Sequence, residues 1–370
     1  MKLRLLGVLL ALAALPTTWA SGQAASAGAQ ATPAAALLAL SKQDHTLAIV
    51  DPASLRVLAR IPVGDDPHEV TASADGKTAY VSNYGFGAFH TLAVIDLVGQ
   101  KPLPSIDLGA LAGPHGLTFV QNKVWFTAEA AKAIGSYSPA SGKIDWIMGT
   151  GQNRTHMLYV FPDAKRILTT NVNSATVTIL EKTEGRAGGP PPGMPPGVGP
   201  PPGGQPMPGA GGPPPGPPPG PPGGDWQLTV IPVGRGSEGF DVSPDGKEAW
   251  VANAQDGTVS VIDIAQKKVV ATLAAKVPGA NRLKFTLDGK LALVSAGPNL
   301  VILDTANRVE MKRLVLGHGS AGIPLQPDGT RAYVACGPDG FVAVVDLKSL
   351  EVVGRIDVGG NPDGLAWAAR

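Results

Sequence analysis

Three histidines recur in similar short loops at wide intervals, and their side chains could together bind a metal ion. The loops read Pro67-His68-Glu69, Pro114-His115-Gly116 and Thr155-His156-Met157, so the histidines lie 47 and 41 residues apart. Neutral imidazole is a common ligand of zinc, copper and iron, and three protein nitrogens beside an open position are typical of a catalytic metal site. No local metal motif has this spacing, so only a repeated fold could bring the three rings together.

The same loop position can be followed through the whole chain. In order, its residues are His68, His115, His156, Glu238, Asn281, Ala321 and Asp363. The carboxylates of Glu238 and Asp363 are candidate catalytic acids or bases, and Glu238 could also be a fourth ligand of a metal. Further candidate ligand-binding residues are Arg154, Asn281, Arg282, His45 and His90.

Two other interpretations of these histidines stay open. Each imidazole could hydrogen-bond a backbone group near the end of its own loop, which would be a structural role. Alternatively, histidine and glutamate could act as acid and base in a ligand pocket that holds no metal.

A repeat in the chain would give these loops equivalent positions in the fold. The residue that ends one strand of each unit is found at Asp51, Asp96, Ser138, Glu181, Asp263, Asp304 and Asp346. Successive positions are 41 to 45 residues apart except for one gap of 82, which contains a Pro/Gly-rich tract of 40 residues at 185–224. A period near forty residues with four short strands per unit is typical of a β-propeller. The sequence therefore predicts an all-β, seven-bladed β-propeller of four-stranded antiparallel blades, with the tract as a disordered insertion within the fourth blade.

The two ends of the chain predict how the ring closes. The last unit stops after its innermost strand, and an extra strand at Ala35–Ser41 precedes the strand Thr46–Asp51. An N-terminal strand that completes the last blade would remove an open sheet edge. Antiparallel strand order then places every loop that enters an innermost strand on one face, around the mouth of the central channel. All six histidines of the chain map to this face.

The repeated strand motif identifies a family resemblance. Tyr80-Val-Ser-Asn83, Trp250-Val-Ala-Asn253 and Tyr333-Val-Ala-Cys336, together with the Pro-Asp-Gly turns, resemble the YVTN-repeat propellers, the YncE-like proteins of bacterial periplasms. The resemblance covers residues 35–370 except the Pro/Gly tract. It implies an exported seven-bladed propeller that acts as a binding or interaction platform, but its motifs specify the blade and not an activity.

The first twenty residues are typical of a secretory signal peptide. Lys2 and Arg4 precede an apolar run at Leu5–Leu15, and Ala20 follows at a position suited to cleavage. We therefore expect a periplasmic or secreted protein with a flexible leader at 21–34, one propeller domain at 35–370 and no transmembrane segment after cleavage. Without Lys2 and Arg4, 28 basic residues balance 29 acidic ones, which disfavours nucleic acid as a partner. We expect a monomer whose partner is a periplasmic protein or a small ligand.

Three classes of function remain after these observations. The first is a non-catalytic platform that binds a ligand or a protein at its histidine-rich face. The second is a metal-dependent hydrolytic or oxidative enzyme in which His68, His115 and His156 hold zinc, copper or iron. The third is a metal-free lyase or lactonase-like pocket. The sequence favours the first and contains no haem-attachment, phosphate-loop or dinucleotide motif.

Overall fold

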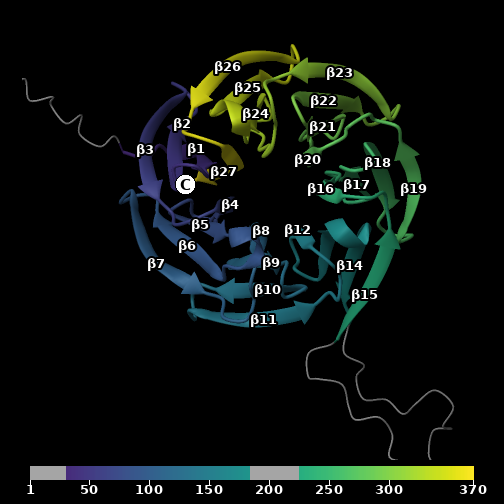
Figure 1. The fold of residues 1–370 in the computed structure, drawn as a ribbon, viewed down its shortest axis with the longest axis horizontal. Coiled ribbons are helices and arrows are strands. Elements are labelled where there is room, and N and C mark those ends of the chain that lie inside the picture. The colour runs from purple at the N-terminus through teal and green to yellow at the C-terminus, as the bar shows by residue number, and fades with distance from the viewer. Residues whose placement is uncertain (1–30, 184–224) are drawn as a thin grey trace, which may run out of the picture.

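Seven sheets form a closed ring around a central channel, as the repeat predicted (Figure 1). The computed structural model describes residues 31–183 and 225–370. The predicted signal peptide (1–20), most of the predicted leader (21–34) and the predicted insertion (185–224) lie outside these residues. Within them, the only helical segments are the short turns η1 (Gly85–Gly87), η2 (Val172–Ser174) and η3 (Gly337–Asp339), and no helix is long and apolar enough to cross a membrane.

The blades are antiparallel sheets, in which the first strand lies at the channel and the following strands lie progressively farther out. The first contains β27 (Pro362–Ala369), β1 (Ala35–Ser41), β2 (Thr46–Asp51) and β3 (Arg56–Pro62). The second contains β4 (Pro67–Ala72), β5 (Thr78–Asn83), β6 (Thr91–Asp96) and β7 (Lys101–Asp107). The third contains β8 (Pro114–Val120), β9 (Lys123–Ala128), β10 (Ala133–Ser138) and β11 (Lys143–Gly149). The fourth contains β12 (Thr155–Val160), β13 (Arg166–Asn171), β14 (Thr176–Lys182) and β15 (Trp226–Pro232).

The remaining three blades continue the ring. The fifth contains β16 (Ser237–Val242), β17 (Glu248–Asn253), β18 (Thr258–Asp263) and β19 (Lys268–Leu273). The sixth contains β20 (Ala280–Phe285), β21 (Leu291–Ala296), β22 (Asn299–Asp304) and β23 (Val309–Val315). The seventh contains β24 (Arg331–Cys336), β25 (Phe341–Asp346) and β26 (Glu351–Asp357).

The innermost strand of the seventh blade is irregular. It is reduced to an isolated bridge between Leu325 and Ala332 and to backbone hydrogen bonds such as Tyr333 N to Pro324 O at 3.0 Å. Pro324 has no N–H group to donate to a sheet, and the preceding segment is rich in glycine, so this stretch follows the channel wall without forming a full ladder.

Ring closure follows the predicted pairing of the two ends. Strand β1 lies antiparallel to β27, with Leu37 opposite Trp367, and the N–H of Arg370 donates to Ala34 O at 2.8 Å. The apolar side chains of the strands pack between neighbouring blades, as Leu38, Ile49 and Val81 do between the first and second. The ring is therefore a rigid frame for the loops at its mouth.

The repeated aspartates have a structural role. Asp75, in a Pro-Asp-Gly-type turn, accepts a hydrogen bond from the N–H of Lys77 at 3.1 Å. Asp51, at the end of β2, accepts one from the N–H of Ala53 at 3.0 Å. These side chains close turns and are not part of a site.

Candidate functional site

The three histidines predicted to face the mouth lie side by side. Each is the second residue of an innermost strand, in β4, β8 and β12 respectively. The ring centroids of His68 and His115 are 4.9 Å apart, and those of His115 and His156 are 3.9 Å apart. The repeat thus brings together residues that are distant in sequence.

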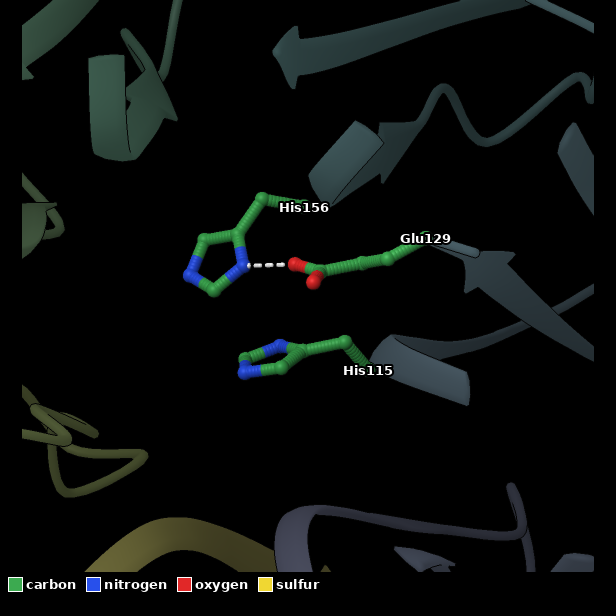
Figure 2. Close-up of side chains that lie close together, drawn as sticks. All are labelled: His115, Glu129 and His156. Carbon is green, nitrogen blue, oxygen red and sulfur yellow. Dashed lines mark hydrogen bonds and ion pairs between the residues drawn. The ribbon is translucent and has the colours of Figure 1, made fainter. Parts of the chain in front are cut away.

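A glutamate completes a tighter group. Glu129 follows the last residue of β9, and it lies beside His115 and His156 (Figure 2). Each of the three residues offers one potential ligand atom, and these atoms all lie within 4.8 Å of one another. All three residues are buried, with exposed fractions of 3% for His115, 6% for Glu129 and 1% for His156.

The Glu129 carboxylate is the centre of a hydrogen-bond network. His156 Nδ1 hydrogen-bonds Glu129 Oε1, and the Tyr84 hydroxyl donates to Glu129 Oε2 at 2.5 Å. On its other side, His156 Nε2 lies 3.0 Å from Glu238 Oε1. The Arg154 guanidinium joins the two carboxylates, with Nε 3.6 Å from Glu129 Oε1 and Nη2 3.3 Å from Glu238 Oε1.

These contacts shift the pKa values of His156 and His115 in opposite directions. Burial disfavours the charged form of His156, but the carboxylates of Glu238 and Glu129 outweigh it and raise its pKa to about 9. Burial and the neighbouring charges of His156 and His68 instead lower the pKa of His115 well below its usual value. Burial and the hydrogen bond to Glu129 raise the pKa of Tyr84. Without a metal, a protonated His156 therefore lies against a neutral His115, with the two ring planes tilted by 39°.

The donor atoms of this group suit a transition metal. Among the described residues, the buried His115 Nδ1 lacks a hydrogen-bond partner. His156 faces Glu129 with Nδ1, and its Nε2 lies on the side of Glu238. Buried polar atoms are normally satisfied, so an unpartnered imidazole nitrogen beside a second imidazole and a carboxylate is suited to metal coordination. Two imidazoles and one carboxylate are a donor set that zinc and iron both accept. We refer to His115, Glu129 and His156 as the His–Glu–His group.

His68 has different partners from the other two histidines. The ammonium of Lys42 lies 2.7 Å from His68 Nε2, and Asp66 Oδ1 lies 3.3 Å from His68 Nδ1. Lys42 also contacts Asp363 at 3.4 Å, which ties that predicted catalytic carboxylate to a lysine. Burial is the main reason that the pKa of His68 is lowered. Glu129, and not His68, is therefore the third member of the group of close ligand atoms.

The other predicted ligand-binding residues lie away from this group, except Arg154. Arg282 donates to the side chain of Asn281 at 2.8 Å and pairs with Glu69 inside the channel. His45 and His90 lie on the exposed rim. Each pairs with an aspartate there at 2.8 Å, His45 with Asp65 and His90 with Asp107.

Glu129, and the contact of Tyr84 with it, were missed because both residues occupy a different repeated position. Each is the first residue after the second strand of its blade. Around the ring this position contains Lys42, Tyr84, Glu129, Val172, Ala254, Gly297 and Gly337. Three polar residues in consecutive blades, next to three consecutive histidines, are the signal that aligning this position would have revealed.

Hydroxyl groups anchor the backbone of the mouth residues. Ser82 donates to His115 O at 2.9 Å, Thr127 to His156 O at 2.7 Å and Thr170 to Glu238 O at 2.9 Å. Each hydroxyl comes from the second strand of the preceding blade and also accepts an N–H from the innermost strand of its own blade. The fifth and seventh blades have Ala252 and Ala335 at this position. The three hydroxyls thus join consecutive blades where the functional side chains lie.

We expect Thr127→Val to lower the free energy of unfolding by about 2 kcal/mol, because it leaves the buried Gly116 N–H and His156 C=O without their partner. Urea denaturation followed by circular dichroism measures this change. Thr272→Val, on the exposed side of β19, is the matched control and should change stability by less than about 0.5 kcal/mol. Equal effects of the two variants would show that the Thr127 hydroxyl does not join the blades.

Seven blades around a channel define the chain as a seven-bladed β-propeller. Its sequence matches no protein-family model and no curated protein. Solved structures share its fold. A functionally unknown protein from Desulfotomaculum acetoxidans has a TM-score of 0.68 and 13% identity over 90% of this chain and 99% of its own.

The similar structures include proteins described as enzymes. A candidate 6-phosphogluconolactonase from Bacteroides uniformis has a TM-score of 0.65 and 14% identity, covering 90% of this chain and 99% of its own. The dihydro-heme d1 dehydrogenase NirN has a TM-score of 0.60 and 15% identity, covering 91% of this chain and 76% of its own. Identities this low establish the shared fold alone.

Proposed function

We propose that this propeller is a metal-dependent hydrolase whose metal is held by His115, Glu129 and His156 at the channel mouth. The observation that carries the proposal is the convergence of three buried donor residues from the third and fourth blades, with the buried His115 Nδ1 unpartnered. Burying so many ionisable groups costs stability, and clusters with strongly shifted pKa values mark functional sites. A platform that only binds another surface has no need of such a cluster.

The surrounding residues are suited to hydrolysis. A bound zinc-class ion would act as a Lewis acid and lower the pKa of water. Burial opposes ionisation of Glu238, but His156 and Arg154 hold its pKa below the usual range, so it is a carboxylate at neutral pH. It is the more exposed of the two glutamates that flank His156, and it can accept a proton from water at the mouth.

Arg154 and Tyr84 would orient the reacting groups. The Arg154 side chain is about one-third exposed (35%), so its guanidinium can both hold Glu238 and stabilise negative charge that develops on a substrate oxygen. Tyr84 fixes the Glu129 carboxylate through its hydroxyl. At the equivalent positions the sixth and seventh blades have the smaller residues Gly297, Asn281, Gly337 and Ala321.

A second candidate function is acid–base catalysis without a metal. It is favoured by the continuous chain of contacts from Tyr84 through Glu129 and His156 to Glu238. Such a chain could move a proton between a substrate and the channel mouth, as the lactonase-like interpretation of the sequence requires.

One experiment separates the candidates. The protein is purified without a polyhistidine tag or chelator, its metal content is measured by mass spectrometry, and hydrolysis of p-nitrophenyl acetate is followed before and after chelation. We expect about one metal ion per chain and hydrolysis that disappears on chelation and returns with metal. Hydrolysis that survives chelation would support the metal-free candidate, and absence of both metal and hydrolysis would contradict both.

The remaining expectations from the sequence stand as proposals beside this function. They are membership of the YVTN-repeat family, export by a signal peptide cleaved near Ala20, one propeller domain at 35–370 with an insertion at 185–224, and a monomeric state. Binding of a periplasmic protein or a small ligand is compatible with the hydrolase, because the substrate itself is such a ligand.

A further inference from the structure

A cavity lies in the channel, apart from the His–Glu–His group. It has a volume of about 630 Å³ and is lined by residues of the innermost segments of all seven blades. None of the three residues of the His–Glu–His group lines it. A volume between about 300 and 1,000 Å³ is typical of pockets that bind small molecules.

An ion pair crosses the channel inside this space. Glu69 in β4 pairs with Arg282 in β20, and these strands lie on opposite sides of the ring (Figure 1). Both side chains are buried, at 10% and 9% exposed, and Arg282 is further fixed by the carbonyl and side chain of Asn281. The charges of Glu69 and Arg282 are therefore compensated within the protein.

The other two charges that line the cavity are not equally accessible. Lys284 Nζ lies 3.2 Å from both carboxylate oxygens of Asp241, which also accepts the N–H of Phe285 at 3.1 Å. The Asp241 side chain is 8% exposed, whereas that of Lys284 is 42% exposed. An ammonium has three N–H donors, so Lys284 can bind a second acceptor that enters the cavity.

The wall of this cavity has apolar as well as polar parts. Its apolar lining residues include Phe119, Tyr159, Phe240 and Ile323. A cavity in which an accessible ammonium lies among aromatic and aliphatic residues is complementary to a molecule that has an apolar body and one anionic group.

We propose that the channel cavity binds an organic acid, with its carboxylate against Lys284 and its aromatic or aliphatic body against the apolar part of the wall. This site is distinct from the proposed metal centre and does not depend on it. The ligand would enter the cavity without displacing the Glu69–Arg282 pair.

The test uses two fluorescent probes of similar body and different charge. These are 8-anilinonaphthalene-1-sulfonate, an anion, and N-phenyl-1-naphthylamine, which is neutral. We expect saturable binding of the anionic probe to the natural chain. Lys284→Met should weaken that binding at least about tenfold and leave the neutral probe unchanged, because a charge-assisted hydrogen bond is lost. Thr118→Trp, which places a large ring in the cavity, should abolish binding of both probes.

A double variant and a measurement of metal content serve as controls. Asp241→Asn combined with Lys284→Met removes the unpaired carboxylate that the single change leaves, and it should show the same loss of anion binding in a folded protein. Metal content should not change in any of these variants, which separates this test from that of the hydrolase. Anion binding that is unaffected by Lys284→Met, or by Thr118→Trp, would overturn the proposal.

Discussion

Replacing His115 by alanine is expected to abolish metal binding at the channel mouth, whereas replacing His68 by alanine is expected to preserve it. His115 belongs to the group whose ligand atoms lie within 4.8 Å of one another, and one of its buried nitrogens is unpartnered. His68 Nε2 instead lies 2.7 Å from the Lys42 ammonium. Loss of a direct ligand should weaken binding by more than about 100-fold, the upper range for residues that only orient ligands. Competition with a chelating dye measures the affinity.

Two further measurements make this comparison decisive. Glu129→Gln keeps the shape of the side chain but removes its charge, and it should weaken metal binding as strongly as His115→Ala. Circular dichroism must show that each variant keeps its sheet structure. If His68→Ala lost as much affinity as His115→Ala, the metal would be held by the ring of three histidines that the sequence suggested.

Gly116→Ala is expected to destabilise the propeller and to displace His156. A Cβ atom at this position would lie 2.7 Å from His156 O and 3.0 Å from Met157 Cα. Both are backbone atoms, so no side-chain rotation can relieve the contact, and β8 and β12 must move apart. Overpacking of this kind costs about 1–3 kcal/mol, and the movement should weaken metal binding about tenfold or more.

Gly149→Ala is the matched control for this substitution. A Cβ atom there would meet nothing within 4 Å, and Gly149 ends the outer strand of the same blade. Thermal unfolding and dye competition should both leave this control close to the natural protein. Normal stability and metal affinity in Gly116→Ala would show that the innermost strands are not packed as closely as described.

Most of the fold could be predicted because its signal is periodic. Asp51 and Asp96 end equivalent strands, and the spacing between such residues was enough to count the blades and to pair Ala35–Ser41 with the C-terminal strand. The irregular segment around Pro324 was not predicted. This segment departs from a regular strand because Pro324 lacks an N–H donor, although the repeat around it is regular.

The site could be predicted only in part, for a related reason. Aligning one loop position identified His115 and His156, because each blade gives that position the same place at the mouth. Glu129 occupies a second repeated position, so its contact with His156 required two alignments to be combined. The Glu69–Arg282 pair joins strands on opposite sides of the channel, and no periodicity in the sequence encodes how far two side chains reach across it.

Ring closure has a consequence for how the chain reaches its native state. Ala35 and Ala369 are neighbours across β1 and β27, although they lie 334 positions apart in the sequence. Contacts of such high sequence separation form slowly, and until β27 arrives one edge of β1 remains an open template for other strands. Lys42, which contacts His68, follows β1 directly. Part of the channel mouth therefore reaches its native structure only when β27 is in place. A chain that is delayed before this step is at its most aggregation-prone.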